Sequence, residues 1–204
     1  MFEEDYKTIE TPTSGEYRDR GSRFLGYAFP VKNEKEVKEI VNKIKKDHPK
    51  ANHHCYAFRL GPSKSAFRFS DDREPSGSAG KPIYGVIQSA DLTDILIVVV
   101  RYFGGTLLGV NGLINAYRSA AKEAVNQNVI VTKPIVENYL LEFEYENINE
   151  VMSIIKQTKA NVVNQDLNEK CSIRVELPKH HADEFLKKIN TSHILKGTVK
   201  IEIL

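Results

Sequence analysis

The residues best able to do chemistry lie in two glycine-rich segments that flank an apolar stretch. Residues 71–82 read DDREPSGSAGKP, residues 95–100 read ILIVVV, and residues 101–112 read RYFGGTLLGVNG. Glycine-rich turns ahead of helices expose backbone N–H groups that bind anions, whereas clustered carboxylates beside serines suit acid–base or metal chemistry. The two segments therefore predict either an anion-binding surface or a small-molecule site.

Neither glycine-rich segment matches an established nucleotide-binding motif. The first fails the P-loop spacing, because Pro82 stands where that motif needs Ser or Thr, and the second lacks the dinucleotide fingerprint. A less specific anion pocket remains, because residues 109–112 lead into a predicted helix. An alternative interpretation, to which we give equal weight, is that these glycines only permit tight turns and close helix packing. The candidate anion- or nucleic-acid-binding residues are Arg23, Ser76, Gly77, Ser78, Gly80, Arg101, Gly104, Gly105, Gly109 and Gly112.

A small-molecule enzyme is the alternative, with carboxylates facing Arg101 across the two turns. An arginine at the end of a buried strand must reach a carboxylate, a carbonyl or a bound anion. Because Asp, Glu, Ser and Gly are also common loop residues, we favour a structural role in which a loop carboxylate pairs with Arg101. The candidate residues of the alternative enzyme are His53, Asp72, Glu74 and Ser76.

The histidines and cysteines of residues 53–55 give no metal site. Successive side chains of a strand point to opposite faces, so His53 and His54 cannot share a pocket, whereas His53 and Cys55 can. Two ligands do not make a zinc site, and no sequence signature supports a thiol nucleophile. We assign no catalytic residue, metal or cofactor.

Apolar periodicity predicts the elements that position these residues. Residues 95–100 are typical of a central strand that is covered on both faces, and residues 53–60 alternate as a half-buried strand. Helical spacing marks residues 37–44 and 113–125, the latter with small alanines that imply close packing on a sheet. Shorter elements are expected at 6–9, 24–31, 66–69 and 83–90, with turns at 11–12, 14–15 and 20–21.

Beyond a linker predicted at residues 132–134, the pattern is strand, helix, strand, strand, helix, strand. This order is the ferredoxin-like βαββαβ unit. The sequence thus predicts an α+β protein with an N-terminal domain at residues 1–133 and a ferredoxin-like domain at residues 136–204. The second domain has nine basic and eleven acidic residues, and the first has twenty and sixteen, so basic character belongs to the first.

Composition excludes some classes of protein. The net charge of +2 over 204 residues argues against a general polyanion binder. Two widely spaced cysteines, with no signal peptide, predict reduced thiols and a cytoplasmic protein. The longest apolar run is far below the ~20 residues that cross a bilayer, so we expect no membrane partner. The sequence leaves the oligomeric state open.

Separated blocks of the sequence resemble the IMPACT family, also called the YigZ family, in its bacterial two-domain form. The blocks are residues 22–24, 53–58, 71–82 and 100–109. The resemblance implies an N-terminal domain like the second domain of ribosomal protein S-five, and a C-terminal domain like a ferredoxin-like module of an elongation factor. It also implies a link to translational control in eukaryotic relatives, through competition for an activator of a kinase that phosphorylates an initiation factor. For bacterial members it implies binding of nucleic acid or ribosomal components.

Four residues depart from the pattern of the family. Arg73 and Asn111 stand where relatives often have Gly, Leu107 where they often have Lys, and Asn115 where they often have Arg. The absent cations weaken the nucleic-acid interpretation. Our leading hypothesis is a cytoplasmic, non-enzymatic binding protein of translation regulation that contacts RNA or a ribosome-associated protein through its N-terminal domain. The alternatives are a hydrolase or transferase with an anion pocket between the glycine-rich turns, and a pure protein-interaction module.

Overall fold

The computed structural model describes residues 4–204 and contains two compact units. The N-terminal unit is Tyr6–Lys133, and the C-terminal unit is Pro134–Leu204 with Glu4 and Asp5. No helix within residues 4–204 is both long enough and apolar enough to cross a membrane. Each unit is described by itself.

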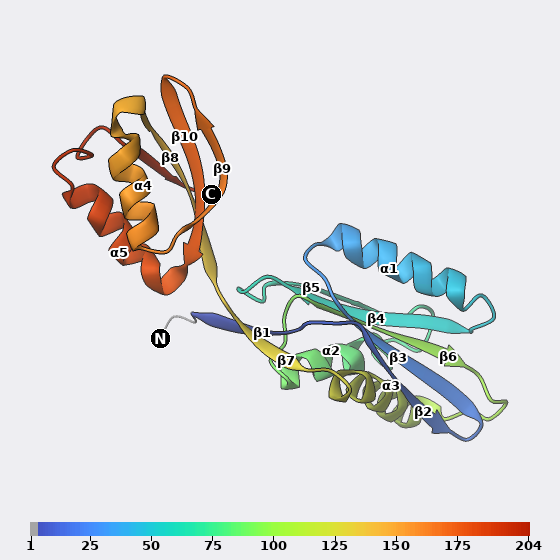
Figure 1. Cartoon of the computed structure of the whole chain (residues 1–204). Coiled ribbons are helices and arrows are strands. Elements are labelled where there is room, and N and C mark those ends of the chain that lie inside the picture. The colour runs from blue at the N-terminus through green and yellow to red at the C-terminus, as the bar shows by residue number, and fades with distance from the viewer. Residues whose placement is uncertain (1–3) are drawn as a thin grey trace. The chain divides into compact units, whose positions relative to one another are not determined.

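A five-stranded antiparallel sheet, in the order β2-β3-β6-β4-β5, organises the N-terminal unit (Figure 1). The central strand is β6, in which every residue from Ile95 to Val100 is completely buried, as the sequence predicts. Strands β3 and β4 pair with its two edges. The strands are β2 (Thr13–Asp19), β3 (Ser22–Pro30), β4 (His53–Leu60), β5 (Ala66–Ser70) and β6 (Ile95–Tyr102).

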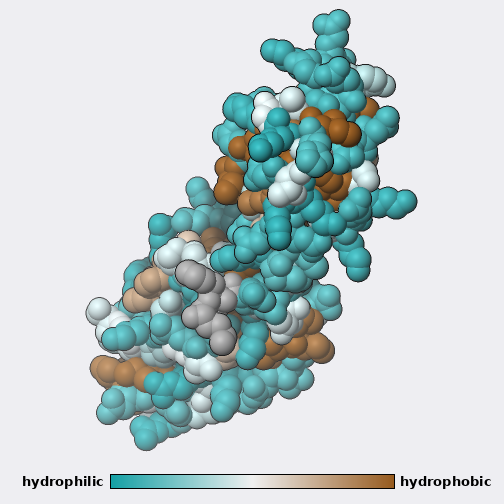
Figure 2. All heavy atoms as spheres, turned by 90° about the vertical axis from the view of Figure 1, so that its left-hand side faces the viewer, coloured by the Kyte–Doolittle hydropathy of each residue, from teal (hydrophilic) through white to brown (hydrophobic). Residues whose placement is uncertain are grey.

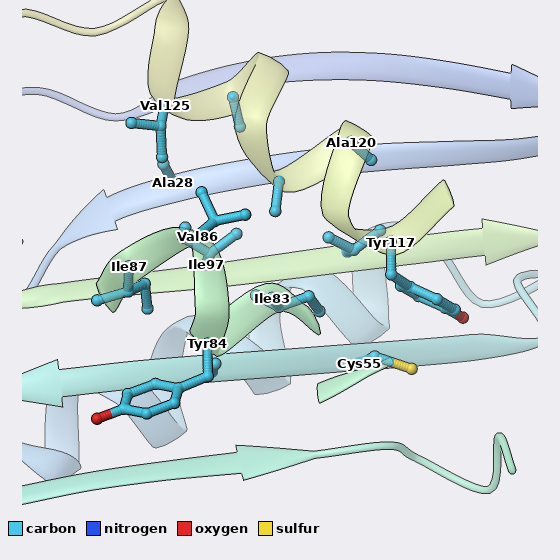
Figure 3. Packing of buried hydrophobic residues seen from close by; sticks show 14 of the residues in the cluster. Ala28, Cys55, Ile83, Tyr84, Val86, Ile87, Ile97, Tyr117, Ala120 and Val125 are labelled. Atoms are coloured by element: carbon cyan, nitrogen blue, oxygen red, sulfur yellow. The ribbon is translucent and has the colours of Figure 1, made fainter. Parts of the chain in front are cut away.

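Helices cover both faces of this sheet, which is why β6 is apolar on both sides. Helix α1 (Glu34–Asp47) packs on one face over Val98 and Val100. Helices α2 (Gly80–Ser89) and α3 (Gly109–Asn126) pack on the other, where Figure 3 shows Ala120, Tyr117 and Cys55 within one buried cluster. The alternation of β6 therefore sorts its side chains between two cores.

Helix α2 begins at Gly80, three residues before the predicted start. Its first turn has no capping side chain of its own. Instead, the backbone N–H groups of Ala79 and Gly80 donate to the carboxylate of Asp71, at 3.0 and 2.7 Å. A carboxylate at a helix N-terminus satisfies unpaired donors and interacts favourably with the helix dipole, so Asp71 fixes where α2 starts.

Two strands were not predicted from the sequence. The predicted linker at residues 132–134 lies in β7 (Ile130–Pro134), which pairs with β1 (Asp5–Ile9), and the predicted turn at residues 14–15 lies inside β2. The turn predicted at residues 14–15 is wrong, because β2 is polar and half exposed and lacks an apolar alternation. The predicted linker does lie where the two units divide, after Lys133, but its residues belong to a short strand. The turn at residues 20–21 is confirmed, since Asp19 pairs with Ser22 across it.

The C-terminal unit has the ferredoxin-like fold. Its antiparallel sheet has the order β11-β8-β10-β9, and its helices pack with the sheet around a core of their own. The elements are β8 (Val136–Glu144), a short 3-10 helix (Tyr145–Asn147), α4 (Ile148–Gln157), β9 (Asn161–Leu167), β10 (Lys170–Pro178), α5 (Lys179–Thr191) and β11 (Lys200–Ile203).

Candidate functional site

A buried ion pair closes the end of strand β6. Nη1 of Arg101 donates to Oε1 of Glu74 at 2.7 Å, and the hydroxyl of Tyr117 on α3 donates to the same oxygen at 2.7 Å. The side chains of Arg101 and Glu74 are only 7% and 3% exposed. The favoured structural interpretation, a loop carboxylate paired with Arg101, is therefore confirmed.

Aromatic rings complete the surroundings of Arg101. The guanidinium carbon lies 5.5 Å from the ring centroids of both Phe24 and Phe103. Its Nε is buried and, among the described residues, has no hydrogen-bond partner. Contact with aromatic faces stabilises a cation. The two rings therefore stabilise the guanidinium in addition to its ion pair with Glu74.

His53 and Cys55 lie on the same face of β4, as predicted, and both donate to carbonyls of the first glycine-rich segment. Nδ1 of His53 donates to Asp72 O at 2.9 Å, and Sγ of Cys55 donates to Asp71 O at 3.1 Å. Nε2 of His53 lies 3.7 Å from Oε1 of Glu74. Burial raises the pKa of the Cys55 thiol above its usual value, so the reactive thiolate is disfavoured. A thiol nucleophile at Cys55 is therefore not supported.

The first glycine-rich segment already binds an anion, and that anion is internal. The carboxylate of Asp71 accepts the N–H of Gly77 at 2.8 Å in addition to those of Ala79 and Gly80. The prediction that Gly77 and Gly80 offer free amides to a phosphate is therefore wrong. Ser78 is completely buried and donates its hydroxyl to Pro75 O at 2.6 Å, whereas Ser76 is exposed.

The second glycine-rich segment follows the packing interpretation. A Cβ on Gly104 would lie 1.9 Å from the carbonyl carbon of Gly21, so only glycine fits there. The φ angles of Gly105 and Gly109 are +88° and +70°, in the region that favours glycine. Gly112 lies against Leu108 at the first turn of α3. Turn geometry and close approach thus account for these glycines.

Arg23 lies on the other face of the sheet from Arg101. Its neighbour Phe24 packs in the core beneath α2 and α3, so Arg23 faces the side of α1. Its Nε and Nη2 donate to the two carboxylate oxygens of Glu16, each at 2.9 Å. The predicted anion-binding residues therefore do not form one surface.

A cavity of about 470 Å³ opens beside the ion pair. Arg101, Glu74 and His53 line its polar end. Its apolar wall consists of Phe103, Leu107, Leu108, Val110 and Leu113. Sequence reasoning identified the polar end and missed the wall, because the wall combines residues that follow β6 with residues in the first turns of α3. Figure 2 shows that the visible surface of each unit is otherwise mostly hydrophilic, with small apolar patches.

The remaining candidate, Asp72, accepts a hydrogen bond from the backbone. Oδ2 of Asp72 accepts the N–H of His54 at 2.7 Å, so Asp72 holds strand β4 and does not line the cavity. Arg73 has a φ of +71°, in the left-handed region that favours glycine. Asn115 donates to the hydroxyl of Tyr17 at 3.3 Å, and Leu107 is 82% exposed. Within residues 4–204, no group of three His, Cys, Asp or Glu side chains is arranged to hold a metal ion.

Comparisons with known proteins agree with this architecture. The chain is 33% identical to the IMPACT family member YigZ of Escherichia coli over 82% of its length and 83% of that protein. It is 32% identical to the IMPACT family member YvyE of Bacillus subtilis over 76% of its length and 71% of that protein. It is also 33% identical to the protein IMPACT homolog of Saccharomyces cerevisiae, over 52% of its length and 42% of that protein.

A solved structure and a family sequence model also match this chain. A solved structure described as the crystal structure of an hypothetical protein matches with a TM-score of 0.79 and 30% identity, covering 100% of this chain and 98% of that one. The sequence model of the Impact N-terminal domain matches residues 20–125, which contain strands β3 to β6 of the sheet, the ion pair and the cavity. This chain is therefore a member of the IMPACT family.

Proposed function

We propose that this protein is a non-enzymatic binding protein linked to the regulation of translation, and that its N-terminal unit contacts RNA or a ribosome-associated protein. Membership of the IMPACT family supports the link to translation, because the resemblance of the sequence ties eukaryotic relatives to translational control. The matched family domain lies within the N-terminal unit, which makes that unit the expected binding part.

The observation that carries a binding function is the internal satisfaction of the ionisable groups at the end of β6. Oε1 of Glu74 accepts hydrogen bonds from Arg101 and Tyr117. The carboxylate of Asp71 accepts three backbone N–H groups, and burial keeps Cys55 protonated. A catalytic acid, base or nucleophile needs access to a substrate. These groups instead stabilise the fold.

Co-sedimentation with bacterial ribosomal particles tests this proposal. We expect the intact chain to travel with the particles at low salt and to be released at high salt, since contacts with phosphates weaken steeply as salt rises. Loss of binding after nuclease treatment would identify RNA as the contact. Free protein at the top of the gradient under all conditions would count against a translation-linked partner.

Paired charge reversals identify the unit that makes the contact. Arg18→Glu with Arg20→Glu changes two exposed residues of the N-terminal unit, at the end of β2 and in the turn that follows it. Lys156→Glu with Lys187→Glu is the matched change on exposed helix positions of the C-terminal unit. We expect weaker co-sedimentation only for the first pair. Equal effects of the two pairs would contradict the assignment to the N-terminal unit.

A small-molecule hydrolase or transferase is the second candidate, and the cavity beside the ion pair is the observation that favours it. His53, Glu74 and Arg101 meet at one end of a space of about 470 Å³, a size typical of ligand pockets. Turnover in a broad phosphatase and esterase screen that disappears in His53→Gln, at an unchanged melting temperature, would support this candidate. Absence of turnover in the whole screen would remove it.

A further inference from the structure

A groove of about 810 Å³ runs between the exposed faces of α2 and α3. It is a different surface from the cavity beside Arg101, which lies at the N-terminal end of α3. Its aliphatic part is formed by Pro82, Val86, Ile114 and Val125. Its charged part is formed by Lys81, Arg118 and Lys122.

The cations of this groove form no ion pair with the acidic side chains of residues 4–204. Lys81, Arg118 and Lys122 are exposed, and within residues 4–204 none of them takes part in an ion pair or a side-chain hydrogen bond. No described acidic side chain lines the groove. Arg118 and Lys122 lie four residues apart on one helix face, where like charges repel. A negatively charged partner would relieve this repulsion.

Gly85 leaves the middle of the groove open. It lies inside helix α2, where glycine is less favourable than alanine. It is exposed, and a Cβ built on it meets no atom within 4 Å. Packing within the chain therefore does not require glycine here, and its absent side chain allows the main chain of a partner to approach α2.

We propose that the groove between α2 and α3 binds an acidic amphipathic helix of a protein partner. This inference rests on the proposed binding function and names the class of partner. In helix-in-groove recognition, an apolar stripe packs on the floor while polar residues face the rim. Aliphatic side chains of the partner would cover Val86 and Ile114, and its carboxylates would reach Lys81, Arg118 and Lys122.

The composition of the groove favours a protein helix over RNA. Proteins that bind single-stranded nucleic acid combine basic residues with aromatic rings on which bases stack. Among the residues that the structure describes, no aromatic side chain lines this groove, and its floor is aliphatic. A base would find no stacking partner there, whereas leucine-like side chains would be removed from water.

A titration with a synthetic probe tests the inference. The probe is a fluorescein-labelled helical peptide with leucines at i, i+3, i+4 and i+7 and glutamates on its other positions, and its binding to the full chain is followed by fluorescence anisotropy. We expect saturable binding that weakens with salt, and no binding of the counterpart with lysines in place of the glutamates. Failure of the acidic peptide to bind, or equal binding of the basic one, would overturn the inference.

Substitutions at Gly85 locate the binding site. Gly85→Trp fills the groove without changing its charge and should weaken peptide binding about tenfold or more, as expected for blocking the centre of an interface. Gly85→Ala is the matched control and should bind as the original chain does. Amide chemical shifts of the Trp variant, measured by nuclear magnetic resonance, will show that it is folded. Equal affinities of the two variants would contradict the proposed site.

Charge reversal tests whether the basic residues of the groove bind the peptide, and an RNA competitor tests whether the groove binds nucleic acid instead. Arg118→Glu with Lys122→Glu should weaken binding of the acidic peptide, whereas Lys156→Glu with Lys187→Glu in the C-terminal unit should not. A short single-stranded RNA that binds the groove more tightly than the peptide would overturn the inference in favour of nucleic acid.

The groove and the proposed function can fail independently. If the original chain co-sediments with ribosomal particles and Gly85→Trp co-sediments equally, the groove is not the contact with these particles, so the function stands and the peptide titration alone decides the inference. If Gly85→Trp alone is released, both are supported. If the original chain never co-sediments, the proposed function fails, and the peptide titration still decides whether the groove binds an acidic helix.

Discussion

Glu74 and Asp71 have the same structural role at two places in the N-terminal unit. Each is a loop carboxylate that accepts hydrogen bonds from other parts of the unit, Glu74 from side chains of β6 and α3 and Asp71 from the start of α2. Buried donors without acceptors are unfavourable, so these carboxylates set the positions of the elements around them. At this scale the acidic loop is part of the framework.

We expect Arg101→Met to lower the free energy of unfolding by about 3–5 kcal/mol, because it leaves the buried carboxylate of Glu74 without its cation. Combining it with Glu74→Gln should cost less than the sum of the two single changes, since the groups are in contact. Urea unfolding of the three variants gives these values.

The matched control for this prediction is an exposed pair of the same type. Nη1 of Arg68 lies 3.6 Å from Oε2 of Glu34, with both side chains more than half exposed. We expect Arg68→Met to lower the free energy of unfolding by at most about 1 kcal/mol. Similar losses for Arg68→Met and Arg101→Met would show that burial does not govern the pair of Arg101 and Glu74.

The carboxyl of Glu16 makes stability depend on pH in the acid range. Hydrogen bonds from Arg23 and Arg18 lower its pKa from 4.5 to about 2. Because the folded pKa lies below the unfolded one, the stabilisation is fully present above 4.5 and is lost as pH falls toward 2. We expect Glu16→Gln to be less stable than the original chain at neutral pH and equally stable near pH 2. A stability difference that stays constant across this range, measured by denaturant unfolding, would contradict the assignment.

At the scale of elements, the close contact between α3 and the sheet depends on small residues. The alanines of α3 meet glycines of β2 and β3, so a Cβ on Gly26 would lie 2.2 Å from Ala120 O and one on Gly15 would lie 2.6 Å from Ala124 N. Because the conflicting atoms belong to the helix backbone, they cannot move without shifting the helix. This contact also holds Tyr117 within reach of Glu74.

We expect Gly26→Ala to lower the free energy of unfolding by about 1–3 kcal/mol, as overpacking does. Gly85→Ala is the matched change in open space and should raise it by about 0.5–1 kcal/mol, because alanine favours a helix over glycine. Urea unfolding compares the two variants. A neutral Gly26→Ala would mean that α3 can move away from the sheet freely.

At the scale of the whole molecule, each unit has apolar cores formed by its own residues. Phe24, Ile97 and Tyr117 belong to one core of the N-terminal unit, and Leu141 and Phe185 belong to the core of the C-terminal unit. Charge also differs, since residues 134–204 have nine basic and eleven acidic residues while the rest has twenty and sixteen. Separate cores allow separate folding.

We expect a fragment of residues 134–204 to fold alone, although with modest stability, because a domain of about 70 residues buries a smaller fraction of its surface than a larger domain does. A fragment of residues 6–133 should also fold, since it retains nearly all of both β1 and β7. Circular dichroism and thermal melts of the fragments provide the measurement. Separate folding would be contradicted if a fragment showed no cooperative thermal transition while the intact chain melted sharply.

The sequence by itself determined the elements that bury a periodic apolar face. Burial removes side chains at a fixed spacing from water, so β4, β6, α3 and the ferredoxin-like order of the second half can be predicted from spacing alone. Strand β2, which is polar, and strand β7, which has only five residues, could not be predicted, because they are stabilised by pairing with a neighbouring strand, which requires no apolar pattern.

The tertiary structure alone decided what the site residues do. The spacing of Arg101, Glu74 and Asp71 permits either a phosphate site or internal pairs, and only the fold shows that their partners come from within the chain. The face on which Arg23 lies, the wall of the cavity and the groove along α2 and α3 depend on residues far apart in sequence. Such contacts depend on how whole elements pack against one another, so they cannot be predicted from the spacing of residues within one segment.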